Sequence, residues 1–169
     1  MYMRKYSKVI LMMLLVFFFA GCDQITKSIA KRELKFSASV NLLGGFVRLQ
    51  YAENEGAFLS AGSGLPAEFR RRMIVLLTVL VLTGFVVLLS FAQKIKYSSL
   101  VPFSLLLAGS LGNVLDRLLN PGRVVDFLIV GTKTIHTGIL NVADLLITTS
   151  VVVLCYTELF HRRGRSALK

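Results

Sequence analysis

Long apolar runs are the feature that most constrains this chain. Residues 73–92 contain no charged side chain, and about 20 such residues cross the hydrocarbon core of a bilayer as a helix. Comparable runs at 9–28, 100–119 and 139–160 predict four transmembrane helices in all. We therefore expect a mainly α membrane protein in which all 169 residues form one integral membrane domain.

Composition supports this assignment and argues against a nucleic-acid partner. Hydrophobic residues make up 54% of the chain and charged residues 17%, with a net charge of +11. Many Lys and Arg residues flank the apolar runs, as Arg4 and Arg70 do, which is typical of helix ends that meet anionic lipid headgroups. No basic face with interleaved aromatic residues remains outside the spans. We expect contact with membrane lipid and none with nucleic acid.

The four predicted spans place both termini on one side of the membrane. The loop 23–72 and the loop 120–140 then share the other side. Lys and Arg are similarly numerous on the two sides, so the positive-inside rule does not decide the orientation. We expect cytoplasmic termini because Arg4, Lys5 and Lys8 immediately precede the first span, and because the rule weakens for a long loop.

The N-terminal region also permits a lipid-anchored protein as an alternative. A basic start, an apolar stretch and Phe19-Ala20-Gly21-Cys22 resemble the lipid-attachment site of a bacterial lipoprotein. A lipoprotein has no need of three further apolar spans. We therefore expect Cys22 to be a small apolar residue at the end of an uncleaved helix.

The long loop between the first two spans predicts a short strand. Residues 46–51 alternate after the Gly44-Gly45 turn signal, which places Val47, Leu49 and Tyr51 on one face.

Polar residues within the apolar spans are candidates for function, because an ionisable group there costs about 2.5–3.5 kcal/mol on insertion scales. Asn113, Asp116 and Arg117 share one face near the end of the third span. We interpret Asp116 and Arg117 mainly as members of an interhelical ion pair that holds the bundle together. Asn141 and Asp144 have i, i+3 spacing near the start of the fourth span.

Two carboxylates, Asp126 and Asp144, reach one depth from the same side of the membrane, each among apolar neighbours. When two carboxylates approach closely, both cannot ionise cheaply, so one keeps its proton and the other acts as a base on water. The residues alone leave two interpretations open. One is a catalytic dyad, and the other is a solvated loop aspartate beside a structural helix aspartate.

A small transporter or channel is the main alternative function. In it, Asp116, Asp126 and Asp144 would form a proton or cation path. Such a path needs polar residues at several depths, whereas here they gather near one face, which favours a site at the surface. The two histidines, His136 and His161, have no partner at ligand spacing, so we expect no metal and no other cofactor.

Five motifs are similar, in order and spacing, to those of the bacterial lipoprotein signal peptidase family, also called signal peptidase II. They are Asp23-Gln24-Ile25-Thr26-Lys27, Asn54-Glu55-Gly56-Ala57-Phe58, Gly112-Asn113-Val114-Leu115-Asp116-Arg117, Arg123-Val124-Val125-Asp126-Phe127 and Asn141-Val142-Ala143-Asp144. The resemblance covers essentially the whole chain. It implies an aspartyl endopeptidase of the bacterial cytoplasmic (inner) membrane that removes signal peptides from prolipoproteins.

The resemblance also implies roles for individual residues. Asp126 and Asp144 match the catalytic pair, and Asp116 falls at a position better interpreted as structural. Positions expected to bind substrate or support the site are Asp23, Lys27, Asn54, Gly56, Asn113, Arg117 and Asn141.

Three further expectations come from the resemblance. The first is a small β-sheet on the extracytoplasmic surface, in the loop between the first two helices, with the active site toward that face. The second is that the partners are diacylglyceryl-modified prolipoproteins, each cut just before the modified cysteine. The third is a monomer with no cofactor.

Overall fold

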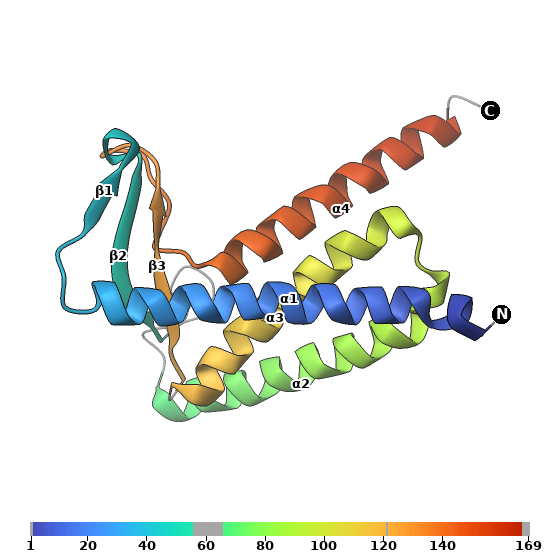
Figure 1. Cartoon of the computed structure of the whole chain (residues 1–169), viewed down its shortest axis with the longest axis horizontal. Coiled ribbons are helices and arrows are strands. Elements are labelled where there is room, and N and C mark those ends of the chain that lie inside the picture. The colour runs from blue at the N-terminus through green and yellow to red at the C-terminus, as the bar shows by residue number, and fades with distance from the viewer. Residues whose placement is uncertain (1, 56–65, 121, 167–169) are drawn as a thin grey trace.

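The structure is a computed structural model that describes residues 2–55, 66–120 and 122–166. The described residues form four α-helices and one three-stranded sheet, with two short 3-10 turns (Figure 1). In chain order the elements are α1 (Tyr2–Leu34), β1 (Val40–Leu42), η1 (Leu43–Gly45), β2 (Val47–Asn54), α2 (Ala67–Phe91), η3 (Ala92–Lys94), α3 (Tyr97–Leu119), β3 (Val124–Val130) and α4 (Val142–Ser166).

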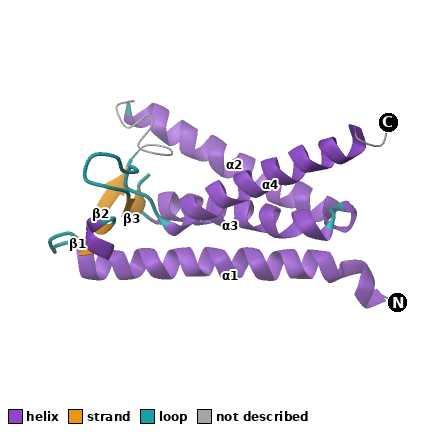
Figure 2. Ribbon diagram, turned by 90° about the horizontal axis from the view of Figure 1, so that it is seen from above, coloured by secondary structure: helices purple, strands orange, loops and turns teal. Residues whose placement is uncertain are grey.

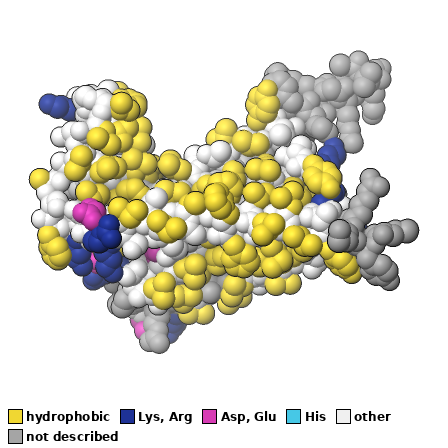
Figure 3. All heavy atoms as spheres, viewed as in Figure 1, with side chains coloured by type: hydrophobic (Ala, Val, Ile, Leu, Met, Phe, Trp, Pro, Cys, Tyr) yellow, Lys and Arg dark blue, Asp and Glu magenta, His cyan; other side chains and the backbone are white. Residues whose placement is uncertain are grey.

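Within the described residues, three helices are long and apolar enough to cross a bilayer. They are Tyr6–Leu34, Val75–Lys94 and Tyr97–Leu119. The apolar part of α4, Val142–Thr157, is shorter. Hydrophobic side chains cover much of the helical surface in Figure 3, and many large ones are exposed. A helix that is apolar on all sides is expected of a chain whose solvent is lipid.

Two of the helices have ends that differ from the ends of the predicted spans. The first helix continues beyond the predicted span to Leu34, and the charged residues of its last turn, Lys31, Arg32 and Glu33, are exposed. Cys22 consequently lies inside α1 and not at its end. The fourth helix begins at Val142 instead of residue 139, because the N–H and C=O of Leu140 are bonded to β3.

The helices pack around α3, with α1 and α4 as its main neighbours. Between α1 and α3, Met12, Val16 and Leu100 are fully buried. On the other side, a Cβ on Gly109 would lie 2.5 Å from the carbonyl oxygen of Ala143, so only glycine permits this approach of α3 to α4. This close packing fixes the start of α4 beside the end of α3.

The sheet is antiparallel throughout, in the order β1-β2-β3. The predicted strand at residues 46–51 is confirmed from Val47 onward, where it forms the first part of β2. The sheet is not confined to the loop between α1 and α2, however, because β3 comes from the connection between α3 and α4. The expectation was incomplete because β3 is a largely buried apolar run without the alternation that identifies a half-exposed strand.

The sheet lies at one end of the helices (Figures 1 and 2). The start of α1 and the end of α4 lie toward the opposite end (Figure 1). The last turns of α1 and α3 and the first turn of α4 therefore meet next to the sheet, and this junction collects the polar residues of the spans.

Candidate active site

Asp126 is held in the middle of β3 and is only 2% exposed. It pairs with Ala52 of β2, directly beyond an irregularity in the strand register between Leu49 and Ala52. Such an irregularity re-aims the following side chains. Two residues further on, Asn54 donates from Nδ2 to Oδ2 of Asp126 across 2.9 Å. The strand pairing thus places a carboxylate and an amide donor on the same face.

Asp144 lies in the first turn of α4, where it forms a reciprocal cap with Asn141. The backbone N–H of Asp144 donates to Oδ1 of Asn141 at 2.9 Å, and the backbone N–H of Asn141 donates to Oδ2 of Asp144 at 3.3 Å. This is the capping-box arrangement, which satisfies two N–H groups at the start of a helix. The i, i+3 spacing noted in the sequence therefore fixes the Asp144 side chain as well as the helix boundary.

Two side-chain amides connect the two carboxylates. Asn141 donates from Nδ2 to Oδ1 of Asp126 at 2.6 Å and to Oδ1 of Asn113 at 3.2 Å. Asn113 in turn donates from Nδ2 to Oδ1 of Asp144 at 3.1 Å. The structure thus brings together Asp126 from β3, Asp144 and Asn141 from α4, and Asn113 from α3, in one hydrogen-bonded group.

This group lines a small cleft of about 10 Å³, which has room for about one water molecule. The lining residues are Asn54, Asn113, Arg117, Val124, Asp126, Asn141 and Asp144. Arg117 also donates from Nη1 to the carbonyl oxygen of Asn113 at 3.0 Å. Both carboxylates therefore face a common space that is about large enough for one water molecule.

Burial raises the pKa of Asp126 to about 6. The hydrogen bonds from Asn54 and Asn141 act against this rise, and so does the positive charge of Lys27. The negative charge of Asp144 adds to the rise. The result is a carboxyl that exchanges its proton near neutral pH, as general acid–base catalysis requires.

A second group of charges lies beneath the first, where α1 meets α3. Lys27 forms ion pairs with Asp23 at 2.8 Å and with Asp116 at 3.0 Å, and all three side chains are at least 96% buried. The ion pair of Asp116 is interhelical, as expected, but its cation is Lys27 of α1 and not the adjacent Arg117. Gln24 supports the group by donating to Oδ1 of Asp116 at 2.9 Å.

The structure therefore gathers most of the residues singled out in the sequence. Asp126, Asp144, Asn54, Asn113, Arg117 and Asn141 line the cleft, and Asp23, Lys27 and Asp116 lie next to it. Gly56 lies outside the described residues. Sequence reasoning assigns no role to Gln24 or Val124, although both lie within the five motifs. The i, i+3 spacing of Asn141 and Asp144 is the sequence pattern that indicates the capping box at the start of α4.

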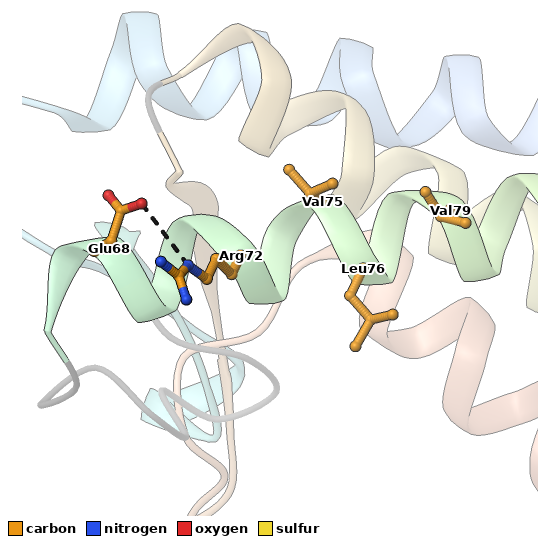
Figure 4. Close-up of a pocket in the computed structure, with 5 residues that line it drawn as sticks. All are labelled: Glu68, Arg72, Val75, Leu76 and Val79. Carbon is orange, nitrogen blue, oxygen red and sulfur yellow. Dashed lines mark ion pairs between the residues drawn. The ribbon is translucent and has the colours of Figure 1, made fainter.

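A larger surface depression lies on α2 (Figure 4) and shares no lining residue with the cleft. It is lined by Glu68, Arg72, Val75, Leu76 and Val79, all from this one helix. Its valine and leucine side chains are more than half exposed, as expected of a helix face in contact with lipid. Within the part of the chain that the structure describes, no three His, Cys, Asp or Glu side chains are grouped so as to hold a metal ion.

The apolar helices define the class as an integral membrane protein, and the amide-bridged carboxylates are its candidate site. The family described as "Signal peptidase (SPase) II" matches residues 14–160, and the chain belongs to this family. It is therefore a peptidase. The buried ionisable residues lie together at the sheet end of the helices, which gives no support to a transporter with charges at several depths.

Relatives of known name agree with this assignment. The chain is 35% identical over 144 residues to "Lipoprotein signal peptidase" of Thermodesulfovibrio yellowstonii, covering 85% of this chain and 91% of the relative. It is 36% identical over 132 residues to the protein of that name in Staphylococcus haemolyticus, covering 77% and 78%. A solved bacterial membrane enzyme superposes with a TM-score of 0.75 at 27% identity, covering 91% of this chain and 90% of that one.

Proposed function

We propose that this chain removes the signal peptides of prolipoproteins by cutting the peptide bond before a cysteine that carries diacylglycerol. Asp126 and Asp144 are the residues that activate the water molecule in this proposal. The observation that carries it is the placement of these two buried carboxylates on one cleft, joined through Asn113 and Asn141.

The chemistry follows from a pair that holds one proton. The ionised carboxylate takes a proton from water, the resulting hydroxide adds to the scissile carbonyl carbon, and the protonated carboxyl gives its proton to the carbonyl oxygen. Transfer of a proton to the amide nitrogen then lets the carbon–nitrogen bond break, releasing a carboxylic acid and a new amino group. No covalent intermediate with the enzyme forms in this sequence.

The position of the cleft suits a substrate that arrives within the membrane. A signal peptide crosses lipid as a helix and must unwind before its carbonyl meets the carboxylates, which frees backbone N–H and C=O groups. Asn54 and Arg117 line the cleft and are the side chains we assign to pair with them. The exposed apolar surface of the helices supports delivery of the diacylglyceryl group from the bilayer.

We further propose four spans, with α4 as the fourth, in the bacterial inner membrane. The termini are cytoplasmic and the cleft is toward the extracytoplasmic face. The supporting arrangement is that α1 begins and α4 ends away from the sheet (Figure 1), with basic residues next to the first apolar run. The enzyme acts as a monomer in this proposal, since Asp126, Asp144 and the two asparagines that join them already come together within a single chain.

The test is incubation of the purified chain with a synthetic diacylated prolipoprotein in lipid nanodiscs, followed by mass spectrometry of the products. We expect one cut, immediately before the modified cysteine, and no effect of EDTA. Asp126→Asn and Asp144→Asn are each expected to lower kcat by at least about 1,000-fold, and the double variant is expected to be little worse, because the pair acts as a unit.

Controls make the result interpretable. The same prolipoprotein without diacylglycerol should remain uncut. Melting curves should show that the single variants are folded. Substantial turnover by either single variant, or activity that EDTA removes and added metal restores, contradicts the proposal.

A further inference from the structure

The residue directly before each cleft carboxylate donates a backbone hydrogen bond to one of the buried carboxylates that pair with Lys27. Val125 precedes Asp126, and its backbone N–H donates to Oδ2 of Asp116 at 3.0 Å. Ala143 precedes Asp144, and its backbone N–H donates to Oδ1 of Asp23 at 2.8 Å. One carboxylate therefore anchors β3 and another anchors the start of α4, each next to the residue whose side chain lines the cleft.

Lys27 connects these two anchors. Its Nζ lies 2.8 Å from Oδ2 of Asp23 and 3.0 Å from Oδ2 of Asp116, and it also donates to Oδ1 of Asn113 at 3.0 Å. An ammonium group has three N–H donors, and here these three acceptors match them in number. The Lys27 side chain is 3% exposed, so water does not compete for these positions.

The third contact also fixes the direction of the amides in the cleft. Lys27 can only donate, so the atom of Asn113 that faces it must be the oxygen. The nitrogen of Asn113 is then directed to Asp144, and Asn141 must present its own nitrogen to Asn113 and Asp126. A single buried ammonium therefore determines which cleft atoms are donors.

We propose that Lys27 is a positioning residue for the peptidase reaction, which sets the spacing of Asp126 and Asp144 through Asp116, Asp23 and Asn113. The inference rests on the proposed function of the two carboxylates and gives a specific role to a residue that does not itself line the cleft. An ion pair that merely stabilised the fold would affect the melting temperature and leave the turnover of the folded enzyme unchanged.

The test compares Lys27→Met with Lys31→Met, one turn further along α1. Lys31 also donates to the side-chain oxygen of an asparagine, Asn120, at 3.2 Å, but this contact is exposed and Asn120 does not line the cleft. We expect Lys27→Met to lower kcat by about 100-fold, since a displacement of about 1 Å has that effect on catalysis, with KM changed less than about 3-fold. Lys31→Met should match the parent.

The pH profile of Lys27→Met gives a readout that loss of folding cannot imitate. The positive charge of Lys27 lowers the pKa of Asp126, against the larger effect of burial, so its removal should move the alkaline limb of kcat/KM to higher pH. The other charged side chains around Asp126 are Asp144 and Arg117 on the cleft, with Asp23 and Asp116 beneath it. All four are unchanged in the variant.

Lys27→Arg covers the case in which Lys27→Met does not fold. Arginine keeps the charge that neutralises Asp23 and Asp116. Its planar fork, however, cannot direct three donors from one nitrogen atom to three different acceptors. We expect a folded enzyme with kcat lowered at least 10-fold. The inference is overturned if either folded variant retains the parent kcat within about 3-fold, or if neither variant folds. Absence of cleavage by the parent would contradict the proposed function itself.

Discussion

The side-chain amide of Asn141 donates to Asp126 across 2.6 Å, which joins the first turn of α4 to the middle of β3. The same side chain accepts the backbone N–H of Asp144 at 2.9 Å. One asparagine therefore contacts both halves of the proposed pair, and its loss should affect catalysis and helix capping together.

Asn141→Ala is expected to lower kcat about 100-fold, because Asp126 loses its shortest hydrogen bond and its position relative to Asp144 is no longer fixed. Loss of the cap should lower the free energy of unfolding by about 1 kcal/mol. Kinetics on a diacylated prolipoprotein and melting curves in detergent measure the two effects. Asn41→Ala, at an exposed position of β1, is the matched control. Parent-like turnover by Asn141→Ala would remove this residue from the site.

The helices are predictable from the sequence because their apolar runs are long enough to cross a bilayer. The junction is also predictable in outline, since a polar residue within such a run is costly and has to be satisfied by another. Asn113 and Asp144 stand out in the sequence for this reason, and both line the cleft.

The remaining features depend on packing that the sequence does not display. The pairing of Asp116 with Lys27, 89 residues apart, follows from the contact between α1 and α3. The strand β3 shows no alternation because most of its residues are buried, so the sequence pattern places Asp126 in a loop. The cap between Asn141 and Asp144 could have been predicted, because a capping box has this i, i+3 spacing.

Gly112→Ala tests the packing that supports the site. A Cβ at Gly112 would overlap Oδ2 of Asp23, which is fully buried and bonded to Lys27. We expect a loss of about 1–3 kcal/mol in the free energy of unfolding from the forced shift, together with lower activity. Gly84→Ala is the control, because a Cβ on this α2 residue meets no atom within 4 Å, and it should be neutral or slightly stabilising. Equal melting temperatures for the two variants would contradict the close contact.

Asp116→Asn separates folding from catalysis. Asp116 accepts hydrogen bonds from Gln24 and Val125 and forms an ion pair with Lys27, and an asparagine keeps the side-chain oxygen but not the charge. Removing one partner of a buried ion pair costs about 3–5 kcal/mol. Because Asp23 still neutralises Lys27, we expect a loss near the lower end, measured as a lower melting temperature in detergent. A variant as stable as the parent would contradict a stabilising role for this ion pair, and loss of activity by such a variant would assign Asp116 to the positioning of Asp126 through Val125.

The pH dependence of activity should follow the pair of carboxylates. The pKa of Asp126 is raised to about 6, so its protonated form is present below this pH and is lost as the pH rises through it. We expect a bell-shaped profile of kcat/KM whose alkaline limb lies near or above pH 6 and whose limbs belong to the pair, not to either residue. Asn141→Ala should move the alkaline limb to higher pH, because its hydrogen bond lowers the pKa of Asp126. A rate that stays flat from pH 4 to pH 9 would contradict the pair.

The same raised pKa predicts how stability changes with pH. Folding raises the pKa of Asp126 from 3.8 to about 6, so the folded protein binds this proton more tightly than the unfolded chain. The stability that comes from it is fully present below about pH 4 and is lost as the pH rises through about 6. Asp126→Asn removes this loss, so its melting temperature relative to the parent should increase from pH 4 to pH 7.5. At about 1.4 kcal/mol per pKa unit the change is at most about 3 kcal/mol. A difference between the two melting temperatures that does not vary with pH would show that Asp126 is not the group that titrates.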